Sequence, residues 1–325
     1  PTSPLISDKV RLFGPTPLQA SLLQPTEEAT FVWDYQTKAG SKGVYTFTGK
    51  ANGMNSSAET SITSNEVSVK LTIQTPAQLV IENIVFQKTL PNSLAIDALT
   101  ISQEQTFNIG VVVRNTGEAV AEEVRPILSI DAPSKIAIVG GEPAPKNVPG
   151  GTVAAFGWTY TGKSAAPSIF VTVNASGKDR NSASSITAPP KISGALTIQT
   201  PSRLTTKMSV LDSNGLLTEM VGTNQTFFVR LEVTNEGQAK AVSVEPKLDF
   251  GLAAIRTVSS PVPGRLDLSE KETKTFQWSL QASREGEVNF TVSGQGIDIN
   301  SQQPVRLEAE PVKVTVIPPP TLVVN

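Results

Sequence analysis

Cysteine and histidine are both absent from this chain of 325 residues. Without histidine, the chain lacks the commonest metal ligand and the one side chain whose ordinary pKa lies close to neutral pH. An activated nucleophile would then depend on lysine or a carboxylate, because no thiol is present either. We expect no nucleophile elbow, phosphate-binding loop or dinucleotide-binding glycine pattern. The sequence therefore predicts no catalytic residue, no cofactor-binding residue and no enzyme activity.

Charge and long apolar runs are also scarce. Charged residues make up 17% of the chain, and the formal net charge is −2. Binding to nucleic acid or to anionic lipid requires a clustered basic surface, and this composition offers none. No run of eighteen apolar residues occurs, so no segment is expected to span a membrane. We therefore expect no nucleic-acid partner and no membrane span.

What the sequence does contain is a repeat. Residues 105–160 and 225–280 share fourteen identical positions at a constant offset of 120. They include Thr106/Thr226, Phe107/Phe227, Asn115/Asn235, Gly117/Gly237, Ala119/Ala239 and Trp158/Trp278. Phe31-x-Trp33-x-Tyr35 repeats the later aromatic motif at an offset of 125, and the hexapeptide at 71–76 recurs at 196–201. A period of about 120 residues is typical of separate domains in tandem, each with its own core.

Each repeat predicts short strands with one buried face. Phe107, Ile109, Val111 and Val113 occupy alternate positions of one such strand. The strand ends at Asn-x-Gly, where we expect a tight turn with positive φ. With plentiful turn residues, this pattern predicts an all-β protein made of tandem immunoglobulin-like β-sandwiches. Short proline-containing linkers at 74–76 and 199–201 would make the array a stiff rod, on the order of 100 Å long at about 3.3 Å per strand residue.

The repeat also predicts where the domains begin and end. Residues 1–75 correspond to the C-terminal half of a unit, residues 76–200 and 201–318 to complete units, and residues 319–325 to the opening strand of a following unit or a linker strand. A half sandwich would expose a long apolar edge, which folded proteins avoid. We therefore expect either that this sequence is a window from a longer repeat protein, or that another chain supplies the missing strands.

Val111 to Ala121, with its copy Leu231 to Ala241, resembles the bacterial and archaeal cell-adhesion-related domain, CARDB. In that family a hydrophobic strand ends in an Asn-x-Gly turn with small residues after it. The resemblance covers residues 77–317 and the second half of a module before them. It implies an extracellular, immunoglobulin-like repeat array that serves as a spacer or contact surface, and it implies no catalytic residue.

Three groups of residues are candidates for a site. Trp33, Trp158 and Trp278 occur once in each unit, and their alternation with phenylalanine favours a buried core position over an exposed sugar-stacking one. Glu122 and Glu123 are adjacent, and we interpret them as a solvated strand edge and not as a catalytic pair. The acidic loop residues, each followed two positions later by asparagine, offer oxygen ligands for Ca²⁺ but too few of them, and they do not lie at equivalent positions of the repeats. These pairs are Asp179/Asn181, Asp212/Asn214 and Asp298/Asn300.

The function that follows is structural and adhesive. We expect a stiff spacer and assembly surface in a cell-surface layer, sheath or fibre, self-associating or contacting other surface proteins through many weak patches. We predict no cofactor and no metal ligand, with Ca²⁺ left open by the acidic loops. An array of carbohydrate- or receptor-binding modules and a set of accessory domains of a secreted hydrolase remain as alternatives.

Overall fold

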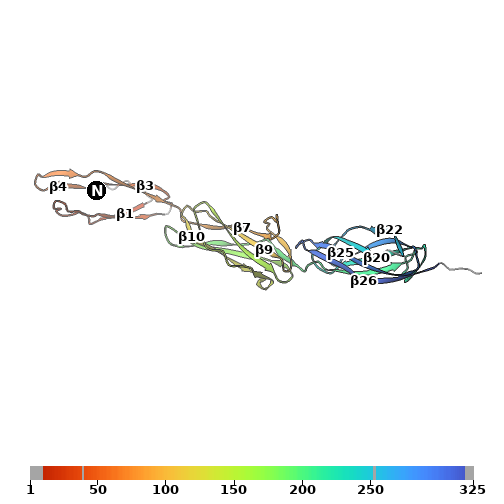
Figure 1. Ribbon diagram of the computed structural model, residues 1–325. Coiled ribbons are helices and arrows are strands. Elements are labelled where there is room, and N and C mark those ends of the chain that lie inside the picture. Colours follow the sequence, from red (N-terminus) through yellow and green to blue (C-terminus); the bar gives the residue numbers. More distant parts are fainter. Residues whose placement is uncertain (1–9, 39, 252–253, 319–325) are drawn as a thin grey trace, which may run out of the picture.

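The computed structural model describes residues 10–38, 40–251 and 254–318, and nearly all of its regular structure is β-strand. The strands pair within three groups, which we call unit 1 (10–73), unit 2 (79–199) and unit 3 (204–317). Within the described residues the helical structure is limited to one short 3-10 turn, Pro133–Lys135. Figure 1 shows the units end to end in a line, from unit 1 in red and orange to unit 3 in blue.

Unit 2 is a β-sandwich. Its strands are β7 (Leu79–Lys88), β8 (Leu99–Ser102), β9 (Thr106–Asn115), β10 (Ala121–Ile130), β11 (Ile136–Ile138), β12 (Lys146–Val148), β13 (Val153–Gly162), β14 (Ala166–Ile169), β15 (Val171–Asp179), β16 (Ser185–Ile192) and β17 (Leu196–Gln199). One sheet has the order β11-β13-β9-β7, the second β12-β10-β15-β16, and a small third sheet β14-β17-β8. Buried side chains from all three sheets form one core.

Unit 3 repeats this architecture with fewer breaks. Its strands are β18 (Leu204–Leu211), β19 (Met220–Gly222), β20 (Thr226–Asn235), β21 (Ala241–Asp249), β22 (Ile255–Val262), β23 (Leu266–Leu268), β24 (Thr273–Ala282), β25 (Gly286–Asp298) and β26 (Pro304–Ile317). The sheets have the orders β18-β20-β24-β22 and β19-β26-β25-β21-β23, so β25 and β26 are continuous where unit 2 has two strands each. A second separate core fills the sandwich. The predicted fold class, tandem immunoglobulin-like β-sandwiches, is confirmed.

The alternation read from the sequence matches burial in the central strands. β9 and β20 have the same pattern, with every second side chain buried along ten residues. β13 lies antiparallel to β9 with Trp158 opposite Ile109, and β24 lies antiparallel to β20 with Trp278 opposite Val229. Since the side chains of a strand point alternately to opposite faces, both indoles enter the core beside this buried row.

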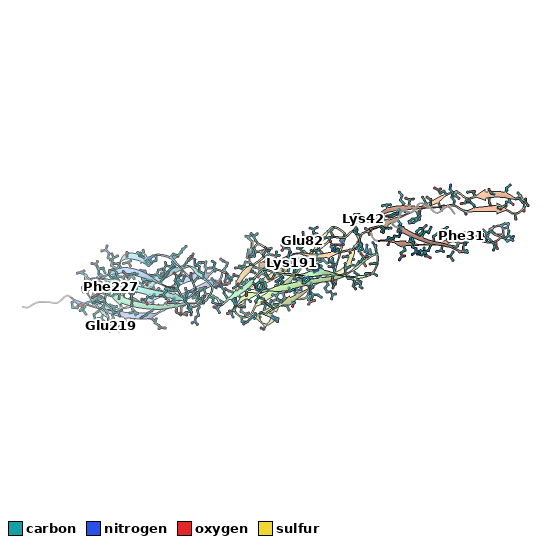
Figure 2. The ribbon with its side chains drawn as sticks, turned by 180° about the vertical axis from the view of Figure 1, so that it is seen from behind. Phe31, Lys42, Glu82, Lys191, Glu219 and Phe227 are labelled. Carbon is teal, nitrogen blue, oxygen red and sulfur yellow. The ribbon has the colours of Figure 1, made fainter. Side chains whose placement is uncertain are left out.

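The two sheets of each sandwich are also tied at their edges. In unit 2, Lys191 Nζ on β16 donates a hydrogen bond to the backbone oxygen of Glu82 on β7, at 2.7 Å. Figure 2 shows these two residues on the same side of the unit. In unit 3, Thr206 Oγ1 on β18 bonds the backbone oxygen of Glu308 on β26. Each contact joins a strand of one sheet to a strand of the other: β16 and β7 are edge strands, and β26 at Glu308 lies beyond its short pairing with β19 at residues 315–317.

Unit 1 contains three separate strand pairs. The strands are β1 (Val10–Thr16), β2 (Val32–Thr37), β3 (Gly43–Gly49), β4 (Asn52–Asn55), β5 (Thr60–Thr63) and β6 (Val67–Ile73), and the pairs are β1-β2, β3-β6 and β4-β5. Tyr35 packs edge-on against Phe47, with ring centroids 4.5 Å apart. The prediction of a core tryptophan is right for Trp158 and Trp278, which are 5% and 4% exposed, but wrong for Trp33, which is 38% exposed. Alternation predicts which side chains share a face, but within residues 10–38 and 40–73 no second sheet buries the face that carries Trp33.

Candidate functional site: the joints between the units

Asn115 and Asn235, which are identical in the repeat, lie beside the joints. Asn115 is fully buried, and its Nδ2 donates to the backbone oxygens of Ala119 and Val148 while its Oδ1 accepts from the N–H groups of Gln78 and Gly117. All four hydrogen-bonding positions of the amide are therefore used. Asn235 makes the corresponding set in unit 3, to Ala239, Leu268, Arg203 and Gly237.

The glycine of Asn-x-Gly is required for a different reason from the one predicted. Neither Gly117 nor Gly237 has the positive φ expected of the turn. Instead, a Cβ on Gly117 would lie 2.0 Å from the backbone oxygen of Pro76, and one on Gly237 would lie 2.0 Å from that of Pro201. The linker proline passes so close to this loop that only glycine leaves room for it.

Each linker is clamped to the unit that follows it. The Thr200 oxygen accepts from Ala239 N–H at 3.0 Å, its Oγ1 accepts from Gln238 N–H at 3.0 Å, and its own N–H donates to Gln238 Oε1 at 3.0 Å. Thr75 makes the same three bonds in the first joint, to Ala119 and Glu118. Because the threonine is held on both backbone and side chain, the linker behaves as part of the following sandwich.

The joint between units 2 and 3 is centred on the buried carboxylate of Asp298, at the end of β25. It accepts hydrogen bonds from the N–H groups of Ser202, just before unit 3, and of Asn300 and Ser301 within that unit, at 2.8, 2.9 and 2.9 Å. From unit 2 it accepts the hydroxyl of Ser102, at the end of β8, with Oγ 3.0 Å from Oδ1. Both Ser102 and Asp298 are buried, so this bond joins the two units away from water.

Asn300 extends this contact. Its Nδ2 donates to Gln199 Oε1 at 2.8 Å, and its backbone oxygen accepts from Lys88 Nζ and Gln105 Nε2, both at 3.0 Å. The backbone oxygen of Gln199 is meanwhile bonded to Gln103 N–H of unit 2 at 2.8 Å. Gln199 is thus fixed to unit 2 and the next residue to unit 3, which leaves no free hinge residue between them.

The electrostatics of the joint favour a charged Asp298. Burial alone would raise the pKa of its carboxyl, but the hydrogen bonds from Ser301, Ser202 and Ser102 outweigh burial and lower the pKa below its ordinary value. Nearby, burial lowers the pKa of Lys88, and the negative charge of Asp298 partly offsets that effect. A buried carboxylate that accepts this many hydrogen bonds is held in a fixed orientation, because moving the loop would leave several buried donors without an acceptor.

The joint between units 1 and 2 contains only part of this arrangement. Asp179 again accepts N–H bonds, from Ala77 just before unit 2 and from Asn181 and Ser182 within it. Asn181 Nδ2 donates to Gln74 Oε1 at 3.0 Å, as Asn300 does to Gln199. Gln74 Nε2 also donates to the Glu118 backbone oxygen at 3.3 Å, and unit 1 itself contributes an exposed ion pair, in which Lys42 Nζ lies 2.5 Å from Glu118 Oε1. Figure 2 places Lys42 where unit 1 meets unit 2.

The expectation that the Asp-x-Asn pairs lie at different positions of the repeat is wrong for Asp179 and Asp298. Ala121 pairs with Asp179 and Ala241 with Asp298 in the strand register, so the two acids occupy equivalent positions of the repeat. Their offset is 119, one less than the offset of 120 along the earlier strands, and a comparison without gaps therefore missed them. A signal was available, because the four residues from each acid read Asp-x-Asn-Ser. Ser102 gave no such signal.

The acidic loops considered for Ca²⁺ have their oxygens engaged by hydrogen-bond donors. Oδ1 of Asp179, Asp212 and Asp298 each accepts the N–H of the asparagine two residues later, at 2.9 Å. These are Asx turns, in which the carboxylate replaces a backbone acceptor. Across the described ranges, no three acidic side chains converge as a cation site would require.

The other sequence candidates lie on strands, although Glu123 has a φ of 53° at an irregularity of β10. Glu122 and Glu123 pair with cations at the end of β15: Lys178 Nζ, on the strand, lies 3.0 Å from Glu123, and Arg180 Nε, just after the strand, lies 2.6 Å from Glu122. Contrary to expectation, residues 157–164 do match the letters of the phosphate-binding loop, G-x-x-x-x-G-K-S. They begin inside β13 with their backbone paired to β9, so they form a strand and not a loop around an anion.

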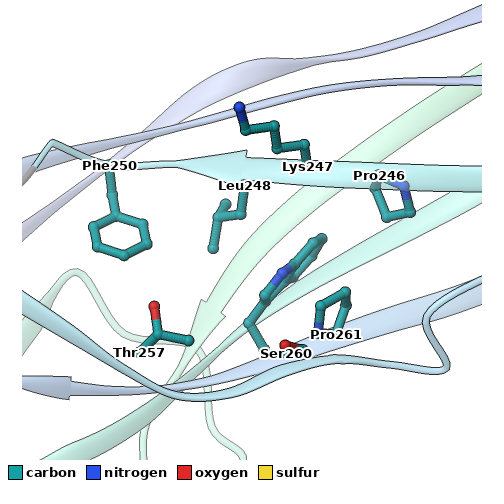
Figure 3. Close-up of a pocket in the computed structure, with 8 residues that line it drawn as sticks. Pro246, Lys247, Leu248, Phe250, Thr257, Ser260 and Pro261 are labelled. Carbon is teal, nitrogen blue, oxygen red and sulfur yellow. The ribbon is translucent and has the colours of Figure 1, made fainter.

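Unit 3 has a surface hollow of about 230 Å³ between β21 and β22. Figure 3 shows its lining, which comprises Pro246, Lys247, Leu248, Phe250, Thr257, Ser260, Pro261 and Trp278. Trp278 is one of the lining residues but is only 4% exposed. The hollow therefore does not present its indole as a surface on which a sugar ring could stack.

No protein-family model and no curated protein matches the chain, so the resemblance to the CARDB family is not confirmed. Among solved structures, it is similar to the C-terminal domain of the Streptococcus agalactiae antigen I/II polypeptide BspA, with 12% identity over 72% of this chain and 100% of that one, and a TM-score of 0.28. The C-terminal domain of the Streptococcus pyogenes antigen I/II-family protein AspA gives 11% identity over 74% and 99%, with a TM-score of 0.25.

Escherichia coli alpha-2-macroglobulin in its native conformation gives 7% identity over 85% of this chain and 29% of that one, with a TM-score of 0.29. TM-scores below 0.5 do not define a common overall fold, so the fold assignment rests on the strand pairing within each unit. In the described part of the chain, no helix has the length and apolar character needed to cross a bilayer.

Proposed function

We propose that this chain is a stiff, non-enzymatic spacer in an extracellular, adhesive surface protein, and that its units also provide a surface for assembly. The observation that carries the spacer role is the joint between units 2 and 3. There, Gln199 is bonded to unit 2, Thr200 is bonded to unit 3, and the buried Asp298 accepts a hydroxyl from Ser102 across the joint.

The physical reason is the cost of bending. Turning unit 3 about this joint would separate Asp298 from Ser102 and Asn300 from Lys88, Gln105 and Gln199. Hydrogen bonds to charged groups contribute about 1.5–3 kcal/mol each, and a stranded buried partner costs a similar amount. Several such losses together exceed thermal energy, about 0.6 kcal/mol, so the straight arrangement is the preferred one.

The extracellular and adhesive part of the proposal draws on the sequence. The resemblance of Val111 to Ala121 to the CARDB family implies a surface array, and the absence of cysteine suits sandwiches that are large enough to fold without disulfides. Self-association, or contact with other surface proteins, would then work through many weak contacts spread along the rod.

The spacer role is tested by small-angle X-ray scattering from residues 1–325 in dilute solution. A stiff joint predicts a pair-distance distribution with the long tail of a rod, and a flexible linker predicts a shorter, rounded one. Assembly is tested separately by sedimentation velocity at rising protein concentration, with and without Ca²⁺. A chain that scatters as a bent ensemble lacks the spacer property, and one that stays monomeric throughout lacks the assembly property.

A further inference from the structure

The chain leaves unit 2 through a short strand. β17 has four residues and pairs in parallel with β8, from Leu196 beside Leu99 to Gln199 beside Ser102. Its other neighbour, β14, adds two register pairs. By contrast, β7, through which the chain enters the unit, pairs with β9 along nine registers. Of the two terminal strands, β17 is therefore the one that a pull along the chain would detach first.

The direction of the strands decides how such a pull acts. The strands of unit 2 run along the line of the units (Figure 1), and β17 ends at the linker to unit 3. A pull on unit 3 would therefore slide β17 lengthwise past β8, which strains all of their hydrogen bonds at the same time. The pull passes along β7 and β8 and crosses to β17, so residues 104–195 lie outside its path while β17 holds.

The second joint holds the strands beside β17 at the same end of unit 2. The Asp298 carboxylate accepts the hydroxyl of Ser102, the last residue of β8. The Asn300 side chain donates to Gln199, the last residue of β17, and the Asn300 backbone oxygen accepts from Lys88, the last residue of β7. Unit 3 is therefore bonded to the ends of three strands of unit 2, and not to β17 alone.

The loop that makes these bonds lies directly on the path of the pull. β26 runs without a break from Pro304, just after this loop, to Ile317 at the far end of unit 3. A pull at that end therefore reaches Asn300 along a single strand. Ser102, Asp298 and Asn300 are all buried, so water does not compete for their hydrogen bonds. Because Ser102 and Gln199 lie side by side, the loop draws β8 and β17 in the same direction.

We propose that the second joint reinforces unit 2 against tension, by sharing a pull along the chain between β17 and β8. While Asp298 holds Ser102 and Asn300 holds Gln199, the two strands move together and β17 does not slide out of the sandwich. A spacer at a cell surface is pulled as well as bent, so the use of this reinforcement rests on the proposed function. Its test does not, because it measures the chain under force and not its shape at rest.

The first experiment pulls the complete chain by its two ends in optical tweezers and locks the strand pair. Because the chain has no cysteine, Thr100→Cys with Thr197→Cys introduces one disulfide between residues that face each other in β8 and β17. Oxidation should shorten the contour length that unit 2 releases from about 400 Å to about 80 Å, at about 3.3 Å per residue, which identifies the rupture of this unit. The rupture force should rise, because β7 must then be detached from β9. Reduction should restore both values.

The second experiment compares two serine variants at that rupture. Ser102→Ala removes the hydroxyl that ties unit 3 to β8, and the unfolding rate of unit 2 at a fixed pull should rise about tenfold, because a hydrogen bond to a charged acceptor is lost. Ser193→Ala is the matched control, since this buried hydroxyl accepts the N–H of Val171 at 3.0 Å but lies outside the path of the pull. Its rate should stay close to that of the native chain, because its contacts remain intact when β17 detaches.

Two results would each overturn the proposal. If oxidation shortens the contour length but leaves the rupture force unchanged, β17 is not the strand that detaches first. If Ser102→Ala and Ser193→Ala unfold at the same rate under the same pull, the joint does not share the tension. The outcome is separate from that of the scattering experiment: a chain that scatters as a bent ensemble but shows both expected force effects would lack the spacer property and keep the reinforcement.

Discussion

Replacing Asp298 with alanine should weaken unit 3 and its joint substantially. The change strands three backbone N–H groups, from Ser202, Asn300 and Ser301, and the hydroxyl of Ser102. Each stranded buried donor costs about 1–3 kcal/mol, and because relaxation and entering water recover part of this, we expect a total of about 4 kcal/mol. For a urea m-value of about 2 kcal/mol/M, the unfolding midpoint should fall by about 2 M.

The assay is urea unfolding followed by tryptophan fluorescence, with Trp278 reporting on unit 3. Asp212→Ala is the matched control, because Asp212 also accepts an Asx-turn bond from Asn214 at 2.9 Å but lies at the surface of the same unit. Its midpoint should move far less. If the two variants unfold at the same urea concentration, then the buried carboxylate does not organise the joint, and the reasoning fails.

The same substitution has a pH signature. Because the pKa of Asp298 is lowered in the folded state, its contribution is fully present above the ordinary aspartate value of about 3.9 and is lost as the pH falls through the folded pKa. The difference in stability between the native chain and Asp298→Ala should therefore be constant at neutral pH and shrink in acid. A difference that grows on acidification would show that the folded state favours the protonated acid.

The remaining predictions concern the rest of the joints. Gly117→Ala should destabilise unit 2 by several kcal/mol, because the added Cβ would overlap the Pro76 oxygen. Gly157→Ala is the control and should leave the stability unchanged, because a Cβ there meets nothing within 4 Å. Thermal unfolding of both variants checks this prediction. Asn235→Ala should lower the stability of unit 3 by about 2–4 kcal/mol in urea unfolding, because it strands buried backbone groups on both sides of the amide. The first joint should loosen in high salt, measured by scattering, since its ion pair is exposed. The first joint should also loosen in acid. The hydrogen bond from Lys42 lowers the pKa of Glu118, so the contact is lost as the pH falls through that lowered pKa. Lys42→Ala should remove the dependence on salt and the dependence on pH.

The stiffness of the second joint can also be measured directly. Since the chain has no cysteine, Thr187→Cys and Glu308→Cys would be its only spin-label sites, one on each side of the joint. Double electron–electron resonance should give a narrow distribution of distances between the two spin labels. Ser102→Ala should broaden this distribution, because it removes the buried hydroxyl between the units. Equal widths would mean that Ser102 does not hold the units together.

The sequence predicted the strands well because burial on one face leaves a period of two. Phe107 to Val113 is such a row, and the structure buries all four of its alternate apolar side chains. The joint could not be predicted, because Ser102 and Asp298 are 196 residues apart and a lone serine has no recognisable pattern. Trp33 marks the limit of periodicity, which identifies the face that a strand presents but not what covers that face.

The parallel pairing that ends each sandwich makes the rod directional. In unit 2, Gln199 lies beside Ser102 in this pairing, and together they receive Asn300 and Asp298. In unit 3, the same two places are taken by Ile317 and Gly222, which carry neither an amide nor a hydroxyl. These two positions therefore cannot supply the side-chain amide and hydroxyl that hold Asn300 and Asp298 in the second joint, and the hydroxyl beside them, that of Thr223, already donates to the Ile317 oxygen.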